Sequence, residues 1–137
     1  MGLLSHFLDI EAISTSNGLF LSRAQYISDI MTQFQMENAK VISTPMSFSD
    51  KLPPPEPSTT IDISRYCRLL GLLQYLTITR PYISFVVNRL SQYMHGPSLA
   101  DWTIAKCILC YLKGTLCHDI LLRSTSSLHL TAFVDAD

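Results

Sequence analysis

The 137-residue sequence predicts an α+β fold that is mostly helical, with short strands near both ends of the chain. Apolar and polar residues alternate near both termini, which indicates strands, whereas between them apolar residues recur at helical spacing. A proline-rich stretch separates the first helical pattern from the later ones. With 47% hydrophobic residues, the chain has enough apolar side chains for one domain core.

Residues 1–42 are predicted to form a β-hairpin and one helix. The stretches HFLDIEAI and STSNGLFLS indicate two strands joined at Asn17-Gly18, a pair that tolerates the positive φ of tight turns. Ser22 is expected to cap the following helix, with Gln25 completing a capping box. Apolar residues then recur at helical spacing, at Tyr26, Ile27, Ile30 and Phe34. We therefore expect this helix to reach about Met36.

Residues 43–62 are predicted to be an extended linker. They include the stretch LPPPEPSTT, in which three consecutive prolines exclude a helix or a regular strand. The linker also separates two regions of opposite charge. Residues 1–64 carry three Lys or Arg against seven Asp or Glu, whereas residues 65–137 carry seven against four. A basic excess of this size is compatible with nucleic-acid binding and equally with an ordinary solvated surface.

Residues 63–116 are predicted to form three amphipathic helices. One stripe of the first helix is apolar, formed by Tyr66, Leu69, Leu70, Leu73 and Leu76. Gly71 lies within this helix and costs about 1 kcal/mol relative to alanine, which indicates either close packing or a local weakness.

The second and third helices have sequence signals for their boundaries. Pro81 is expected to open the second helix, and His95-Gly96-Pro97 to end it with a glycine cap and a proline stop. Its predicted apolar face comprises Ile83, Val86, Val87, Leu90, Tyr93 and Met94. Ser98 and Asp101 indicate the cap of the third helix, which Gly114 closes. Its apolar residues are Ile104, Ala105, Ile108, Leu109, Tyr111 and Leu112.

Residues 117–137 are predicted to form a second β-hairpin. The stretch DILLR, the polar turn STSS and the stretch LHLTAFVDAD indicate strand, turn and strand. The last strand leads into Asp135 and Asp137, and carboxylates at a strand end are able to anchor divalent cations. Two neighbouring acids are too few for a two-metal centre, so a solvated strand end is the simpler interpretation.

Other chemistries are poorly supported by the sequence. Cys107 and Cys110 fall within a predicted helix, and Cys117 is adjacent to His118, which does not match the turns of a structural zinc site. The cysteines are therefore interpreted as small hydrophobic residues. The histidines are scattered and the glycines dispersed, so neither a hydrolase triad nor a phosphate-binding loop is indicated.

The sequence also bears on cellular location. No apolar run approaches the roughly 20 residues that a membrane helix requires. The N-terminal stretch MGLLSH lacks the basic region of a secretory signal. We expect an intracellular protein with reduced thiols that does not associate with membranes; its compartment is left open.

Several long blocks of the chain resemble the Pol polyprotein of copia-type retrotransposons. They are FLDIEAISTSNGLFLSRAQYISDIM, STPM, YCRLLGLLQYLTITRPYISFVVNRLSQYMHGP, ADWTIAKCILCYLKGT and SSLHLTAFVDAD. In that family such blocks cover the end of the reverse transcriptase and the start of RNase H. The resemblance implies that residues 1–42 belong to the palm and thumb, 63–116 to a helical thumb or connection, and 117–137 to the start of a truncated RNase H-like domain.

The resemblance also implies roles for particular residues. Basic side chains of the helical region would contact the phosphates of a template–primer or an RNA–DNA hybrid, and the candidates are Arg65, Arg68, Arg80, Arg89, Lys106 and Lys113. Asp135 would be the first RNase H carboxylate and a ligand of Mg²⁺ in the parent enzyme. The Tyr-x-Asp-Asp motif of the polymerase is expected before Met1, and the other RNase H acids after Asp137. Neither active site is then complete, and we expect no bound cofactor and no catalysis by the chain alone.

This sequence departs from the family pattern at several positions. The family commonly has glycine at the position of Asp9, an acid at Tyr82, and arginine at Cys107 and Cys110. The loss of two guanidinium groups weakens phosphate contact by that helix. Two alternatives to a polyprotein fragment therefore remain open: a non-catalytic nucleic-acid-binding module, and a small scaffold protein adopted from a retroelement whose open strand edge mediates self-association.

Overall fold

The computed structural model describes residues 6–44, 60–125, 127, 129 and 131–132. The chain begins with strands β1 (His6–Phe7), β2 (Ile10–Thr15) and β3 (Gly18–Ser22), followed by helix α1 (Ala24–Gln33). After residues 45–59 come helix α2 (Ile63–Leu76), the short 3-10 helix η1 (Pro81–Ile83), helix α3 (Ser84–Ser91), helix α4 (Leu99–Gly114) and strand β4 (Ile120–Arg123). The predicted α+β class is confirmed. The predicted linker lies mostly outside the described residues.

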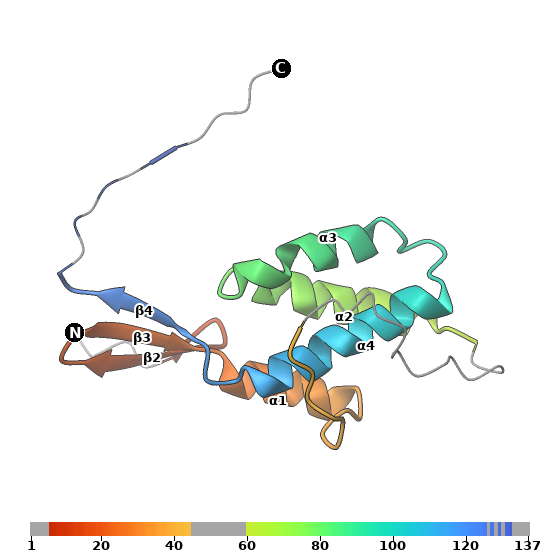
Figure 1. Cartoon of the computed structure of the whole chain (residues 1–137), viewed down its shortest axis with the longest axis horizontal. Coiled ribbons are helices and arrows are strands. Elements are labelled where there is room, and N and C mark those ends of the chain that lie inside the picture. Colours follow the sequence, from red (N-terminus) through yellow and green to blue (C-terminus); the bar gives the residue numbers. More distant parts are fainter. Residues whose placement is uncertain (1–5, 45–59, 126, 128, 130, 133–137) are drawn as a thin grey trace.

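The described strands form one antiparallel sheet in the order β1-β2-β3-β4 (Figure 1). Strand β4 pairs with β3, so that Leu21 lies opposite Ile120 and Gly18 opposite Arg123. The sequence predicts a different partner for β4, namely the last strand of the chain. Most of that last stretch lies outside the described residues, so the second hairpin remains a prediction. The observed pairing shows that Ile120–Arg123 joins the N-terminal sheet.

The tight turns of the sheet differ in detail from the prediction. The turn between β2 and β3 is formed by Ser16 and Asn17, because Thr15 pairs with Gly18. Gly18 has a φ of 144°, a value that L-residues rarely adopt. The N-terminal strand prediction HFLDIEAI is split by a second turn at Leu8 and Asp9, whose φ values are 49° and 59°. Positive φ at both central residues is characteristic of a type I′ hairpin turn.

The predicted apolar stripe of α2 is the centre of the core. All five of its residues are buried: Tyr66, Leu69, Leu70, Leu73 and Leu76. Residues of α1, α3 and α4 pack around them, including Ile30, Leu90 and Ile108. The Tyr66 hydroxyl donates a hydrogen bond of 2.9 Å to the Leu90 carbonyl, which satisfies the one polar atom of this side chain inside the core. Burial raises the pKa of Tyr66 to about 12.

The predicted ends of the helices are right for α4 and wrong for α1, whereas for the second predicted helix the start at Pro81 is right and the end is wrong. The Ser98 hydroxyl and the Asp101 carboxylate form the expected capping box. Helix α1 is preceded by Arg23 rather than Ser22 as its N-cap and ends at Gln33. Pro81 opens η1, and α3 ends at Ser91, before His95-Gly96-Pro97. Gly96 lacks the positive φ that a glycine cap requires, so it does not end a helix.

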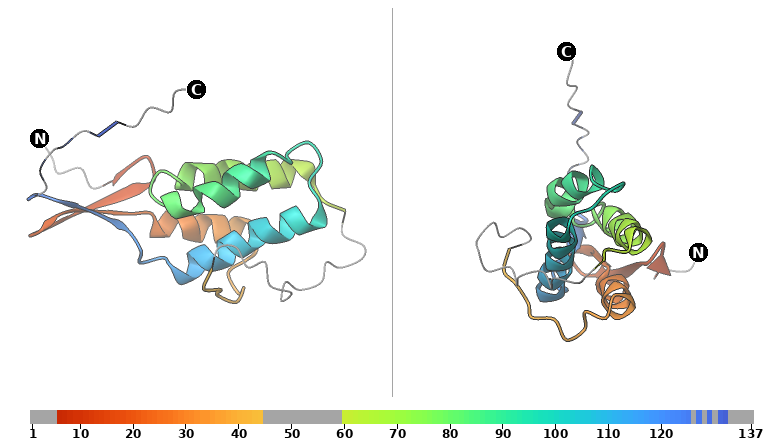
Figure 2. Two further views of the ribbon diagram at one scale, coloured as in Figure 1. Left: turned by 45° about the horizontal axis from the view of Figure 1, so that its top comes forward. Right: turned by 90° about the vertical axis from the view of Figure 1, so that its right-hand side faces the viewer.

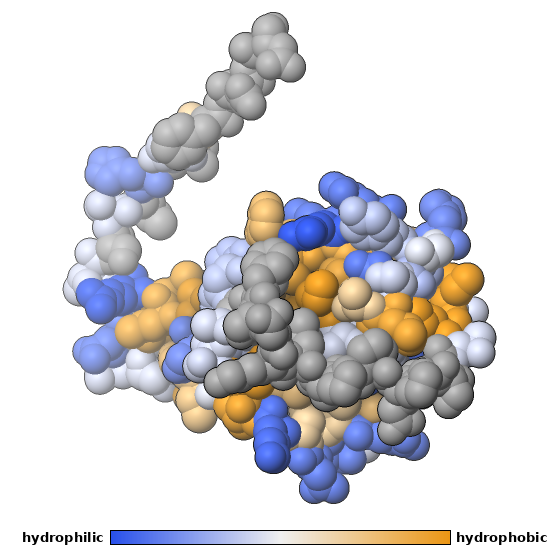
Figure 3. Space-filling model, turned by 45° about the vertical axis from the view of Figure 1, so that its right-hand side comes forward, coloured by the Kyte–Doolittle hydropathy of each residue, from blue (hydrophilic) through white to orange (hydrophobic). Residues whose placement is uncertain are grey.

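The sheet projects from one end of the helical bundle (Figure 2). Among the described strand residues, only Ala12 and Ser22 are buried, so neither face of the sheet is covered by a helical layer. Apolar side chains reach the surface of both the sheet and the bundle (Figure 3). The large exposed ones of the sheet are Phe7, Ile13, Leu121 and Leu122. Among the described helices, none is long and apolar enough to cross a membrane.

Candidate nucleic-acid interface

Arg80, one of the six basic residues proposed to contact phosphate, is buried and holds two parts of the fold together. Its side chain is 1% exposed and forms a 3.1 Å salt bridge with Asp119, itself only 5% exposed. The same guanidinium donates to the carbonyls of Thr115 at 2.6 Å and Leu116 at 3.3 Å, and to the hydroxyl of Tyr82 at 2.7 Å. With its donors used in this way, Arg80 joins the turn before η1 to the segment that follows α4.

Lys113 is also engaged within the fold. From the last turn of α4, its ammonium group donates to the carbonyl of Ala39 at 2.9 Å and to that of Glu37. These bonds tether the segment after α1 to α4. Arg89 lies on the exposed part of α3, in its last turn, and is not among the residues that line the pocket described below.

The other three predicted residues gather around two aromatic rings. Arg65 of α2 lies over the rings of Phe34 and Trp102, at 5.5 Å and 5.9 Å from their centroids. The ammonium group of Lys106 lies 5.8 Å from the Trp102 ring. Cation–π contacts of this kind hold a charged side chain without neutralising it. The Trp102 ring in turn packs against Phe34 and Tyr66, which fixes the group on the core.

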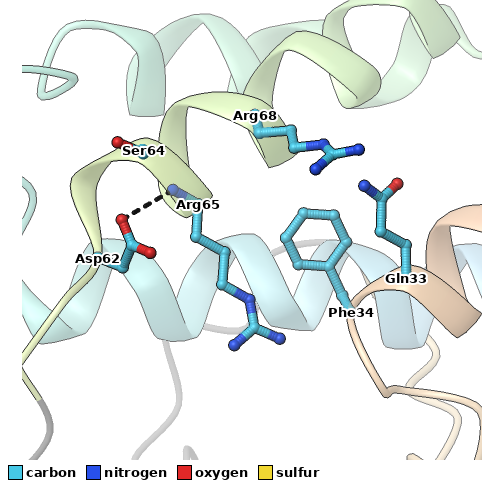
Figure 4. A pocket seen from close by; sticks show the side chains of 6 residues that line it. All are labelled: Gln33, Phe34, Asp62, Ser64, Arg65 and Arg68. Atoms are coloured by element: carbon cyan, nitrogen blue, oxygen red, sulfur yellow. Dashed lines mark hydrogen bonds between the residues drawn. The ribbon is translucent and has the colours of Figure 1, made fainter.

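Arg68 completes the group one helical turn after Arg65. With its amide oxygen turned toward Arg68, Gln33 accepts a hydrogen bond of 2.7 Å from the Arg68 Nε atom. Arg65 and Arg68 then line a pocket of about 300 Å³ together with Gln33, Phe34, Asp62 and Ser64. In the view of Figure 4, the Phe34 ring lies between the two guanidinium groups. We call Arg65, Arg68 and Lys106 the basic triad.

The basic triad retains its positive charge toward solvent. None of its three members has a carboxylate within salt-bridge distance in the described part of the chain. The nearby Asp62 carboxylate caps α2 by accepting from the Arg65 backbone N–H at 3.2 Å, rather than pairing with a guanidinium group. Uncompensated cations that are held by aromatic and amide groups are suited to bind an anion such as phosphate.

The described residues contain no cluster of three or more His, Cys, Asp or Glu side chains able to hold a metal ion. Burial raises the pKa of both the Cys107 and the Cys110 thiol, which favours the neutral form over the thiolate that binds metal. Asp135 lies outside the described residues. Its role as a metal ligand remains a prediction.

The sequence patterns do not single out Gln33, Phe34 and Trp102 as partners of the basic residues. Phe34 and Trp102 come from the end of α1 and from α4 and meet only in the folded chain. Arg23 was also missed: it is buried, stacks on Tyr75 at 4.1 Å and donates to the Tyr75 carbonyl at 2.9 Å. The Arg23 Nε atom is buried without a hydrogen-bond partner among the described residues. No local sequence pattern predicts that this arginine is buried.

Comparison with known proteins links the chain to transposon polyproteins. It is 43% and 44% identical, over 98% of its length, to the retrovirus-related Pol polyproteins from transposons RE2 and RE1 of Arabidopsis thaliana, and it covers 9% of each. It is also 37% identical to an uncharacterized mitochondrial protein of the same plant, of which it spans 57%. No family model and no solved structure matches the chain.

The likeness is continuous rather than confined to one motif. A third Pol polyprotein, from transposon TNT 1-94 of Nicotiana tabacum, is 35% identical over 90% of this chain, which corresponds to 10% of the polyprotein. The chain is therefore homologous to one segment of the copia-type, retrovirus-related Pol polyproteins of transposons and spans a tenth or less of their length.

Proposed function

We propose that the chain corresponds to the end of the reverse transcriptase and the start of RNase H in such a polyprotein. In this proposal it contributes contacts to the template–primer or RNA–DNA hybrid and performs no catalytic step by itself. The observation that carries the nucleic-acid part of the proposal is the basic triad. Arg65 and Lys106 lie over the Trp102 ring, Arg68 is held by the Gln33 amide, and none of the three has a carboxylate partner in the described residues.

The basic triad has the properties of a phosphate-contacting surface. Two of its cations are held by aromatic rings and the third by the Gln33 amide, so little side-chain entropy is lost when a phosphate binds. Contacts of this kind fix the position of a duplex without reading its sequence. Arg80 and Lys113 are engaged with backbone carbonyls, so we assign them to the stability of the fold rather than to the nucleic acid.

The absence of autonomous catalysis is proposed on chemical grounds. Mg²⁺-dependent phosphoryl transfer and hydrolysis need carboxylates from several separate elements. In the resemblance to the family, Asp135 supplies one RNase H ligand, and further acids would have to come from elsewhere in a parent polyprotein.

The proposal is tested by binding of the full chain to a labelled RNA–DNA hybrid, measured by fluorescence anisotropy across a series of salt concentrations. Affinity is expected to fall steeply with salt, because each phosphate contact releases counterions. Arg65→Gln and Arg68→Gln should each weaken binding and reduce the slope of log K against log salt by about 1. Arg123→Gln, which removes an exposed arginine of β4, is the matched control and should leave the slope unchanged.

Three outcomes would contradict the proposal. Hybrid binding that does not depend on salt would contradict a role for the basic triad. An equal loss of affinity in Arg65→Gln, Arg68→Gln and the control Arg123→Gln would also contradict it. Primer extension or hybrid cleavage by the isolated chain with Mg²⁺ or Mn²⁺ would overturn the claim that it does not catalyse alone.

A further inference from the structure

We propose that the pocket between α1 and α2 holds one sugar–phosphate unit of an RNA strand and favours RNA over DNA. The inference rests on the proposed function. It further specifies that the basic triad contacts the RNA strand of a hybrid. It is carried by an acidic and a hydroxyl side chain in a pocket that is otherwise built for phosphate: Asp62 and Ser64 line it together with Arg65 and Arg68.

The pocket has the chemistry of both halves of a ribonucleotide backbone. The guanidinium groups of Arg65 and Arg68 are donors that match phosphate oxygens. Asp62 offers carboxylate oxygens as acceptors, and the Ser64 hydroxyl is able to donate or accept. A volume of about 300 Å³ is at the lower end of the range for ligand pockets, which suits one sugar–phosphate unit rather than a base pair.

Asp62 is the residue that distinguishes the two sugars. Its Oδ1 atom accepts from the Arg65 backbone N–H at 3.2 Å, which leaves acceptor capacity on the carboxylate for a further donor. The 2′-hydroxyl of RNA is such a donor, whereas deoxyribose has none. Against DNA, the carboxylate would face the phosphate backbone without a compensating hydrogen bond, and like charges repel.

The position of Asp62 favours this interpretation over a purely structural one. As the N-cap of α2 it requires only an oxygen acceptor, which serine, threonine or asparagine would supply equally well. A negative charge in a phosphate-binding pocket weakens binding of any polyanion unless a hydroxyl of the ligand uses it. The charge of Asp62 then serves selectivity between the two sugars.

The inference is tested with two labelled single strands of identical length and base order, one RNA and one DNA. Their affinities for the full chain are measured by anisotropy at one fixed salt concentration. The wild-type chain is expected to bind the RNA about tenfold more tightly, because one hydrogen bond to a charged group corresponds to about that ratio. An RNA strand carrying 2′-O-methyl groups, which accept but do not donate, should bind like the DNA.

Asp62→Asn is the decisive variant, since asparagine caps a helix as well as aspartate does. It removes the charge and is expected to strengthen DNA binding and to bring the RNA-to-DNA ratio close to one, with an unchanged melting temperature. Asp62→Ser provides a second cap-preserving substitution with the same expected loss of selectivity. Asp29→Asn, an exposed acid of α1 outside the pocket, is the charge-matched control and should leave the ratio unchanged.

The outcomes separate the inference from the function on which it rests. Equal affinity for RNA and DNA in the wild type, with both weakened by Arg68→Gln, would overturn the inference and leave the proposed function standing. A preference for RNA that Asp62→Asn and Asp29→Asn reduce equally would also overturn it. Absence of binding to either strand and to the hybrid would overturn both.

Discussion

Gly71 and Gly18 have different roles. A Cβ atom added at Gly71 would meet no other atom within 4 Å, so the close packing considered from the sequence is absent and only the weakness of glycine in a helix remains. At Gly18 an added Cβ would overlap the Leu122 carbonyl oxygen of β4, and the residue has a positive φ. The first glycine is dispensable for the fold and the second is required by it.

Gly71→Ala is therefore expected to stabilise the chain by about 1 kcal/mol, because alanine restricts the unfolded chain and favours the helix. Gly18→Ala should destabilise it, because the new methyl group would push β4 away from β3. Chemical denaturation followed by circular dichroism measures both free energies of unfolding. A loss of stability in Gly71→Ala would show that α2 depends on this glycine in a way that its surroundings do not reveal.

Individual residues also show why some sequence predictions held and others did not. The stripe of α2 was predicted correctly because five apolar residues at helical spacing leave few alternatives. The basic residues carry no such local signal, since Arg80 and Arg65 look alike in the sequence. Arg80 is buried and pairs with Asp119, whereas Arg65 lies at the surface over the Trp102 ring. Both contacts join residues that are far apart in the sequence.

At the level of elements, Arg80 connects the helices to the sheet. Its contacts reach the carbonyls that follow α4 and the carboxylate of Asp119, which directly precedes β4. A buried ion pair of this kind adds little over an apolar pair, but breaking it leaves an uncompensated charge inside the protein. The Arg80 guanidinium group therefore helps to fix the orientation of β4 relative to α4, together with the pairing of β4 with β3.

Asp119→Asn is expected to cost roughly 3 kcal/mol of stability, because the Arg80 cation would lose its charged partner while staying buried. Thermal unfolding gives the loss. Hybrid binding at a temperature where the variant remains folded should equal that of the wild type, since neither residue is assigned to phosphate. A variant of full stability with weakened binding would instead place Arg80 in the interface.

Boundaries of elements were the less predictable part of the fold. The end of α3 at Ser91 and the turn at Leu8-Asp9 both depend on backbone conformations that the surrounding structure imposes. Asp9 has a positive φ, a conformation that glycine would adopt without strain. The pairing of β4 with β3 was missed because spacing patterns carry information about neighbours in sequence only.

For the whole molecule, the uncovered sheet is the most consequential feature. A sheet normally buries at least one face against another layer, yet this one projects from the bundle with apolar side chains exposed (Figures 1 and 3). Among the described strands, β4 lies at an edge of the sheet, where its outward backbone groups have no partner strand in the described part of the chain. These two properties favour the strand-mediated self-association that the sequence also predicts.

The chain is accordingly expected to form dimers or larger species as its concentration rises, measured by size-exclusion chromatography with light scattering. Leu122→Lys should shift the equilibrium toward monomer, because a charge on an edge strand opposes pairing. Phe85→Lys replaces an exposed aromatic residue of α3 and serves as the control. A monomer at every concentration, or an equal effect of both substitutions, would contradict the prediction.

The pairing of β4 with β3 has a consequence for synthesis on the ribosome. Strand β4 follows all the described helices along the chain, so the edge of β3 has no β4 to pair with until residues 120–123 have left the exit tunnel. All the described helices are translated after the hairpin of β2 and β3 and before β4, the strand that pairs with β3. A chain released before Ile120 would therefore present an open, apolar ribbon to chaperones, even with the core around α2 already assembled.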